Sequence, residues 1–259
     1  MAKVLAITNQ KGGVGKTTTT VNLAASLAAA KKRVLLVDLD PQGNATMGSA
    51  INKATLAITV YEVLIGTKSV REARIYSEAG KYDILPANRE LAGAEIELVD
   101  IENRETRLKA ALDLVQDDYD FILIDCPPAL NLLTLNGLCA AKSVMIPMQC
   151  EYYALEGLSD LVNTIRKVRT NLNVDLEIEG LLRTMYDPRN SLAQQVSEQL
   201  LKHFGDKVYR TVIPRNVRLA EAPSFGLPAL YHDRESRGTQ AYLALAGELM
   251  NNATVAEPI

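Results

Sequence analysis

A glycine-rich loop near the start of the chain joins an apolar segment to an amphipathic one. Residues 10–17 read Gln-Lys-Gly-Gly-Val-Gly-Lys-Thr, and they lie between a strand-like segment at 3–8 and a helical pattern that begins near Lys16. Glycines let successive backbone N–H groups curl around a phosphate, and the amino end of a helix adds a partial positive charge. Lys16 can then reach the outer phosphates, and the Thr17 hydroxyl can bind Mg²⁺. The loop predicts a nucleotide-phosphate site; a glycine-rich turn without a ligand is the weaker alternative.

The loop departs from the usual phosphate-binding pattern at two positions. Gln10 stands where the first glycine is expected, and Lys11 adds a second lysine. A second ammonium so close to the phosphates is costly unless it points elsewhere or meets shared negative charge. One solution is that Lys11 reaches a nucleotide bound by a second subunit, and that Gly12, lacking a side chain, lets two protomers approach face to face. A solvated Lys11 is the alternative.

Short apolar segments alternate with longer amphipathic ones along the chain. This pattern is typical of an α/β fold with a mostly parallel, twisted β-sheet flanked by helices. The expected strands are 3–8, 34–38, 83–86, 121–125, 143–147, 179–184 and 208–213. The expected helices are 16–30, 104–116, 132–141, 155–170, 192–204 and 239–251. The periodicity does not reveal the order of the strands.

The composition fits one globular domain. The 259 residues carry 28 Lys and Arg against 31 Asp and Glu, and no linker-like segment divides them. We expect a single domain over 1–259, with a flexible tail from about residue 252. No apolar run approaches the roughly 20 residues of a membrane span, and the first residues lack a signal-peptide pattern. With three widely spaced cysteines and no CxxC pair, the chain is expected to be cytoplasmic with reduced thiols.

Two expected strands end in acidic residues. The segment 34–37 leads into Asp38 and Asp40, and the segment 121–124 leads into Asp125. In a parallel sheet, ligands gather outside the carboxyl ends of the strands. These three carboxylates can therefore converge on a metal ion and an attacking water, although an isolated Asp at a strand end is more often a cap or turn residue. Together with the loop, they predict a Mg-nucleotide-binding α/β protein.

Several segments together resemble the deviant Walker ATPases of the ParA/MinD group, and most closely the chromosomal ParA proteins of the Soj type. The resemblance rests on Lys11–Thr17, on Asp38–Asn44 and on Ile124–Pro128. It continues through 149–158 and 213–224 and covers the chain from residue 3 to about 250. The implied fold is that of a P-loop NTPase with a deviant Walker A motif. The implied activity is ATP hydrolysis with Mg²⁺, slow without a partner.

The resemblance assigns roles to residues at matching positions. Lys11 would contact the nucleotide of the partner subunit in an ATP-dependent sandwich dimer, Asp40 would orient the water, and Asp125 is the Walker B acid. The catalytic set is Lys11, Lys16, Asp40 and Asp125, and the metal set is Thr17, Asp40 and Asp125. The nucleotide-binding set is Lys11, Gly12, Gly13, Val14, Gly15, Lys16, Thr17, Thr18, Pro214 and Asn216, of which the last two match the segment that lines the adenine pocket.

The resemblance also implies that the ATP-bound dimer binds DNA without sequence preference. A ParB-type (Spo0J-type) protein would stimulate hydrolysis and release the dimer from the DNA, and this cycle would segregate the origin region on the nucleoid. The window 183–218 carries a net charge of +4, whereas 87–120 carries −6. Arg189 and Arg218 match positions of DNA-binding arginines, and such contacts supply sequence-independent affinity. Without the resemblance, either arginine reads as a solvated surface group.

Two alternatives remain at this stage. A MinD-like membrane-cycling ATPase needs a basic amphipathic C-terminal helix, but residues 238–259 contain no Lys or Arg. A nucleotide-binding regulatory switch with little hydrolysis is compatible with the same motifs. The sequence does not reveal the hydrolysis rate, the dimer affinity, the partner's binding surface, the full set of DNA contacts or a role in replication or transcription.

Overall fold

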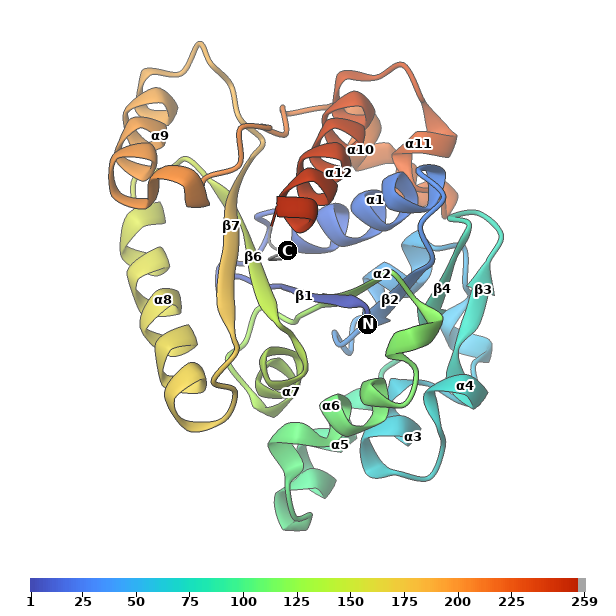
Figure 1. Cartoon of the computed structure of the whole chain (residues 1–259). Helices are drawn as coiled ribbons and strands as arrows, with labels where there is room; N and C mark the ends of the chain where they lie inside the picture. The colour runs from blue at the N-terminus through green and yellow to red at the C-terminus, as the bar shows by residue number, and fades with distance from the viewer. Residues whose placement is uncertain (256–259) are drawn as a thin grey trace.

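The computed structural model describes residues 1–255, with side chains through residue 252. In this part of the chain, a seven-stranded sheet has the order β3-β4-β2-β5-β1-β6-β7, and every pairing but the antiparallel β3–β4 is parallel (Figure 1). The strands are β1 (Lys3–Ile7), β2 (Val34–Asp38), β3 (Ile75–Ser77), β4 (Tyr82–Leu85), β5 (Phe121–Asp125), β6 (Ser143–Gln149) and β7 (Glu177–Thr184). This is the mostly parallel α/β fold that the sequence predicts.

The central strands consist almost wholly of buried apolar residues. Each residue of β2 and β5 is buried, as expected for strands that are covered on both faces. β5 lies between β1 and β2, and the register pairs Asp125 with both Ile7 and Asp38. The end of β5 therefore lies beside the start of the glycine-rich loop and beside the acidic end of β2.

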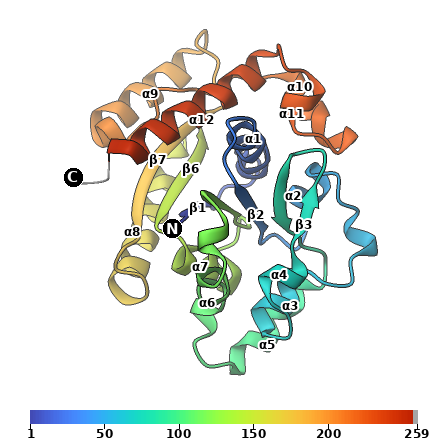
Figure 2. The same ribbon diagram turned by 45° about the vertical axis from the view of Figure 1, so that its right-hand side comes forward.

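Helices cover both faces of the sheet. One layer comprises α1 (Lys16–Ala29), α2 (Asn44–Gly48), α10 (Val217–Glu221), α11 (Ala229–His232) and α12 (Arg237–Val255). The other comprises α3 (Val60–Ile65), α4 (Val70–Ala73), α5 (Leu91–Glu97), α6 (Arg107–Asp113), α7 (Leu132–Ala140), α8 (Ala154–Asn171) and α9 (Ser191–Phe204). Figure 2 shows α12 lying over α1 on one side of the sheet and α6 and α7 on the other. Two apolar cores result, one on each face.

The expected strand at 208–213 is wrong. This segment runs beside the edge strand β7, where the N–H groups of residues 209 and 213 donate to the β7 carbonyls of Leu181 and Arg183, but it forms only an isolated bridge, between Val208 and Leu181. Other backbone groups of the segment are bonded to side chains: Glu248 accepts from the N–H groups of residues 210 and 211, and Arg183 donates to the carbonyls of residues 209 and 210. A regular strand pairing would need those same backbone groups.

Other elements differ in extent. The helix expected at 104–116 is reduced to α6, with a 3₁₀ turn before it and another after it. The short strand β3 and the short helices α2–α5, α10 and α11 were not expected. The tail expected from about residue 252 falls on the last turn of α12, which extends to Val255, and on residues 256–259, which lie outside the described residues. No helix in residues 1–255 is both long enough and apolar enough to span a lipid bilayer.

Candidate nucleotide-binding site

The glycine-rich loop crosses the carboxyl edge of the sheet between β1 and α1. Gly13 and Gly15 have φ values of 72° and 90°, in the left-handed region that disfavours residues with a Cβ. Gly15 directly precedes the first residue of α1, and the loop is anchored from outside because the Thr184 hydroxyl at the end of β7 donates to the Val14 carbonyl at 2.7 Å. The loop amides thus surround the positive end of a 14-residue helix.

Lys16 lies inside the site. Its side chain is buried, and its Nζ donates to the Lys11 carbonyl at 3.2 Å across the loop. Burial lowers the pKa of Lys16, and the nearby carboxylate of Asp125 opposes that shift. An ammonium that has lost much of its hydration and has one neutral partner is well placed to bind an anion.

Asp125 is held by two hydroxyl groups from the first turns of α1. Thr17 Oγ1 donates to Asp125 Oδ2 at 2.7 Å, and Thr20 Oγ1 donates to Asp125 Oδ1 at 3.0 Å. Burial and the neighbouring carboxylate of Asp38 raise the pKa of Asp125. The carboxylate is therefore fixed in orientation but kept in an environment that disfavours its charge, which is a setting that a cation would stabilise.

The other two predicted carboxylates separate into different roles. Asp38 is fully buried and accepts from the backbone N–H and hydroxyl of Thr46 and from the Asp40 N–H, so it braces the turn after β2. Burial raises the pKa of Asp38 as well. Asp40 is half-buried and lines the cavity. Among the described residues, no three His, Cys, Asp or Glu side chains are arranged to hold a metal ion by themselves.

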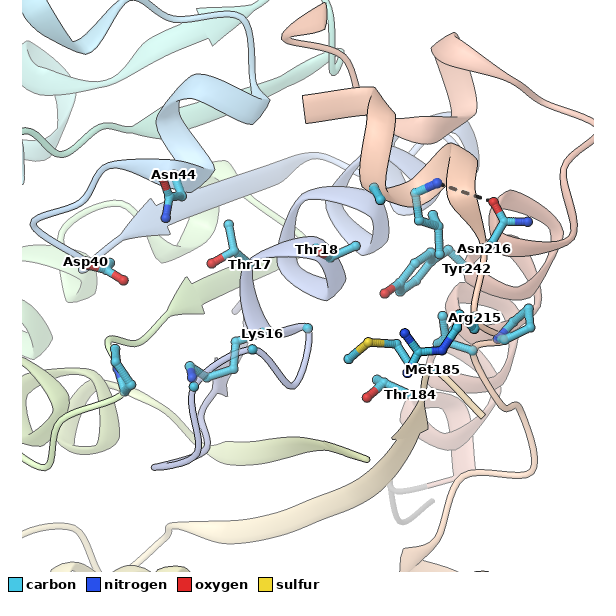
Figure 3. A pocket seen from close by; sticks show the side chains of 18 residues that line it. Lys16, Thr17, Thr18, Asp40, Asn44, Thr184, Met185, Arg215, Asn216 and Tyr242 are labelled. Carbon is cyan, nitrogen blue, oxygen red and sulfur yellow. Dashed lines mark hydrogen bonds between the residues drawn. The ribbon is translucent and has the colours of Figure 1, made fainter. Parts of the chain in front are cut away.

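A cavity of about 410 Å³ opens beside the loop. Figure 3 shows Lys16 and Thr17 between Asp40 and Asn44 on one side and Met185, Arg215 and Tyr242 on the other. The lining includes Gly12, Gly13, Gly15, Thr18, Pro214 and Asn216 of the predicted nucleotide set. The volume lies in the range of small-molecule sites. Asn216 Oδ1 accepts from the Leu219 N–H at 3.3 Å and caps α10, so the wall opposite the loop is itself ordered.

Several residues of this wall were not identified from the sequence. Counting the whole cavity lining, they are Asn44, Pro128, Thr184, Met185, Ile213, Arg215, Leu219, Ala220 and Tyr242. Like Asp125, Thr184 is a polar residue at the carboxyl end of a strand, so the same sequence pattern could have identified it. Met185 adopts a left-handed φ of 49°, which is rare for a non-glycine residue. Tyr242 comes from α12, and its OH lies 3.1 Å from Thr19 Oγ1. Nothing in the local sequence marks these last two.

Lys11 lies outside the cavity lining, and Gly12, which belongs to that lining, has open space where a side chain would begin. Lys11 Nζ lies 2.5 Å from Glu151 Oε2, both side chains are about half exposed, and Lys11 is not part of the cavity lining. A Cβ built on Gly12 would meet no atom of the described residues within 4 Å. Apart from this exposed ion pair, no side-chain contact within the described residues accounts for a lysine at position 11 or a glycine at position 12.

The two candidate DNA-contacting arginines are exposed and paired with neighbouring acids. Arg189 makes a two-pronged ion pair with Asp187, at 2.8 and 3.0 Å, which lowers the pKa of Asp187 to about 2. Arg218 contacts Glu221 at 2.8 Å and Asp233 at 3.2 Å. Exposed pairs of this kind contribute little to stability and exchange readily for other anions.

Comparisons with known proteins extend the likeness over nearly the whole chain. The family described as AAA domain matches residues 2–178. Sporulation initiation inhibitor protein Soj of Bacillus subtilis is 58% identical over 252 residues, 97% of this chain and 100% of that protein. Chromosome-partitioning ATPase Soj of Treponema pallidum is 50% identical over 250 residues, 96% of this chain and 98% of that protein. A crystal structure of cobyrinic acid a,c-diamide synthase from Mycobacterium smegmatis, with bound ATP analog and magnesium, has a TM-score of 0.88 at 37% identity and covers 99% of this chain and 98% of that one.

Proposed function

The chain belongs to the ParA/Soj family of chromosome-partitioning ATPases, and from that premise we propose that ATP with Mg²⁺ joins two copies of it into a dimer that binds DNA without sequence preference. A ParB-type protein then stimulates hydrolysis and releases the DNA. The observation that carries the nucleotide part is the cavity lined by buried Lys16 and by Thr17, whose hydroxyl is hydrogen-bonded to Asp125.

ATP fits the residues that line the cavity. Lys16 and the loop amides would hold the phosphates, while the wall formed by Pro214 and Asn216 would face the base. The Thr17 hydroxyl and an Asp125 carboxylate offer oxygen ligands of the type that Mg²⁺ prefers. The protein would supply one or two of the ligands, and phosphate and water oxygens would complete the coordination shell. Mg²⁺ would neutralise charge that develops on the phosphate oxygens.

Hydrolysis requires a water aligned with the bond that breaks. The half-buried Asp40 carboxylate would accept a hydrogen bond from this water and orient its oxygen toward the γ-phosphorus. The oxygen–phosphorus bond to ADP breaks as the bond to water forms, and phosphate leaves with the water's oxygen. Lys16 would stabilise the charge on the transferred group, since its ammonium is directed into the cavity.

The dimer is supported by two residues of the loop, Lys11 and Gly12. Lys11 lies outside its own cavity, so its ammonium is free to exchange Glu151 for the phosphates of a second copy. Gly12 has no steric need to be glycine within the chain, which is expected if a second chain packs against it. A Gly12→Val chain should fold but fail to dimerise in sedimentation velocity with ATP–Mg²⁺, and binding of a fluorescent ATP analogue measures whether the cavity that Gly12 lines still takes nucleotide.

The DNA part of the proposal is supported by charge and exposure. Arg189 and Arg218 are held only in exposed ion pairs, and phosphate oxygens can replace the carboxylates in both. Binding of a random-sequence duplex should appear with ATP–Mg²⁺ but not with ADP–Mg²⁺, and should weaken steeply with salt. Arg189→Glu should weaken it, and Arg71→Glu, a charge reversal at another exposed arginine, serves as the matched control.

Three results would redirect the proposal. Absence of DNA binding in every nucleotide state at low salt would remove the DNA part and leave the ATPase. ATP-dependent binding to vesicles of anionic lipid would favour the membrane-cycling alternative. Equal ATP turnover by the unaltered chain and by Asp40→Ala would remove Asp40 from its role and favour a switch with little hydrolysis.

A further inference from the structure

A second cavity lies on the far side of the molecule from the phosphate loop. It has a volume of about 490 Å³ and is bounded by α8, the first residues of β7 and the end of α9. In Figures 1 and 2, α8 and α9 lie beside β7, away from β3 and β4. Because β7 runs from Glu177 at this cavity to Thr184 at the nucleotide cavity, the two sites are roughly 25 Å apart at about 3.3 Å per residue. We call it the α8–β7 groove.

The groove has an apolar floor and a basic rim. Val162, Ile165, Ile178 and Phe204 contribute apolar surface, and Arg166, Arg169 and Lys207 carry positive charge around it. These three cations are exposed, and none has an ion pair with an acid among the described residues. Glu177 also lines the groove, and it too has no ion pair in residues 1–255. The rim therefore keeps a net positive charge.

The sheet edge is open at the same place. β7 is the edge strand, and the segment that follows α9 bridges it only from Leu181 onward. Glu177 and Ile178 of β7 thus border the groove without a strand on their outer side in the described residues. An exposed strand edge beside apolar pockets is a common docking surface for an extended peptide.

We propose that the α8–β7 groove docks a short acidic peptide segment of a partner protein, with apolar side chains between its Asp and Glu residues. The apolar floor takes the apolar side chains, and the carboxylates pair with Arg166, Arg169 and Lys207. A nucleic-acid backbone would meet the same cations but would leave the apolar floor uncovered, so the peptide fits the groove better. This surface is separate from the nucleotide cavity and from Arg189 and Arg218.

Peptide arrays test the proposal with the full-length chain. The probes are 12-residue peptides in which Glu alternates with Leu, Ile or Phe in many orders, together with a matched set in which Lys replaces each Glu. We expect the acidic set to bind at least tenfold more strongly than the Lys set. The Arg166→Glu/Arg169→Glu pair should reduce binding about tenfold or more, and Lys207→Glu, on the opposite wall, should reduce it independently.

The matched control is Lys167→Glu/Lys202→Glu, which makes the same charge change on α8 and α9 at exposed residues outside the groove lining. It should leave peptide binding within twofold, and all variants should keep basal ATP turnover. The proposal fails if the acidic set shows no preference, or if the control pair weakens binding as much as the groove pair. It also fails if the groove pair abolishes duplex-DNA binding while no acidic peptide binds the unaltered chain.

Discussion

The inner and outer sides of the phosphate loop are built differently. On the inner side, Lys16 and Asp125 are buried, and both Asp125 oxygens accept hydrogen bonds from hydroxyls of α1. On the outer side, Lys11 is half exposed and has one ion pair, with Glu151. The inner groups are oriented before any ligand arrives, whereas Lys11 is held by a contact that a competing anion can replace. The two sides of the loop thus differ in how firmly their charged groups are held.

The largest effect is expected from the inner lysine. Lys16→Ala should reduce ATP turnover by about 10²–10³-fold, the usual loss when a charge that stabilises the transferring group is removed. It should also weaken binding of a fluorescent ATP analogue. Lys11→Ala is the control, because it should keep analogue binding while losing the ATP-dependent dimer. If both variants lost analogue binding to a similar extent, Lys11 and Lys16 would not have the separate roles expected of the outer and inner sides of the loop.

A smaller effect is expected at Thr20, whose hydroxyl holds the second oxygen of Asp125. Thr20→Val keeps the side-chain shape but leaves that oxygen without its donor, and we expect about a tenfold loss of turnover with a higher Mg²⁺ requirement. Thr20→Ser should restore most of both. If the Ser and Val variants behave alike, the hydrogen bond has no role in positioning Asp125.

The buried carboxylates on the inner side should lower the free energy of unfolding of the nucleotide-free chain. Burial raises the pKa of both Asp38 and Asp125, so the folded state binds more protons than the unfolded state over the pH range between the ordinary and the raised pKa. The free energy of unfolding should therefore fall as pH rises through that range. Asp125→Asn should abolish ATP turnover yet raise the midpoint of thermal unfolding at pH 8. Each kcal/mol gained in the free energy of unfolding should raise that midpoint by about 2–4 °C. A lower midpoint at pH 8 would contradict this.

The smallest effect is expected on the outer side. Glu151→Gln removes the charge that holds Lys11, and an exposed pair is worth about 0–1 kcal/mol, so dimerisation with ATP–Mg²⁺ should strengthen by no more than about fivefold. Sedimentation velocity over a concentration series measures it. Glu156→Gln, also in the segment that follows β6, is the matched control. A weaker dimer in Glu151→Gln would mean that Glu151 itself contacts the second copy.

The fold class followed from local patterns, but the edge of the sheet did not. Six of the seven expected strands form, because continuous apolar runs can be buried only inside a sheet that is covered on both faces. The segment 208–213 also has strand-like β-branched and aromatic residues, yet Arg183 and Glu248 bind its backbone groups from elsewhere in the chain. No pattern within the segment could reveal partners that lie 25 or more residues away.

The phosphate side of the site was determined by the sequence itself, since a strand, a glycine-rich loop and a helix start are consecutive and the geometry of the loop is local. The opposite wall was decided by the tertiary structure. Met185 reaches the cavity from the residue after β7, Arg215 from the segment before α10 and Tyr242 from α12. The positions of these segments depend on packing against α1 and the sheet. The tertiary structure also decided the ion pair between Lys11 and Glu151 and the α8–β7 groove. Each feature joins residues that are distant along the chain and that meet only when both apolar cores are formed.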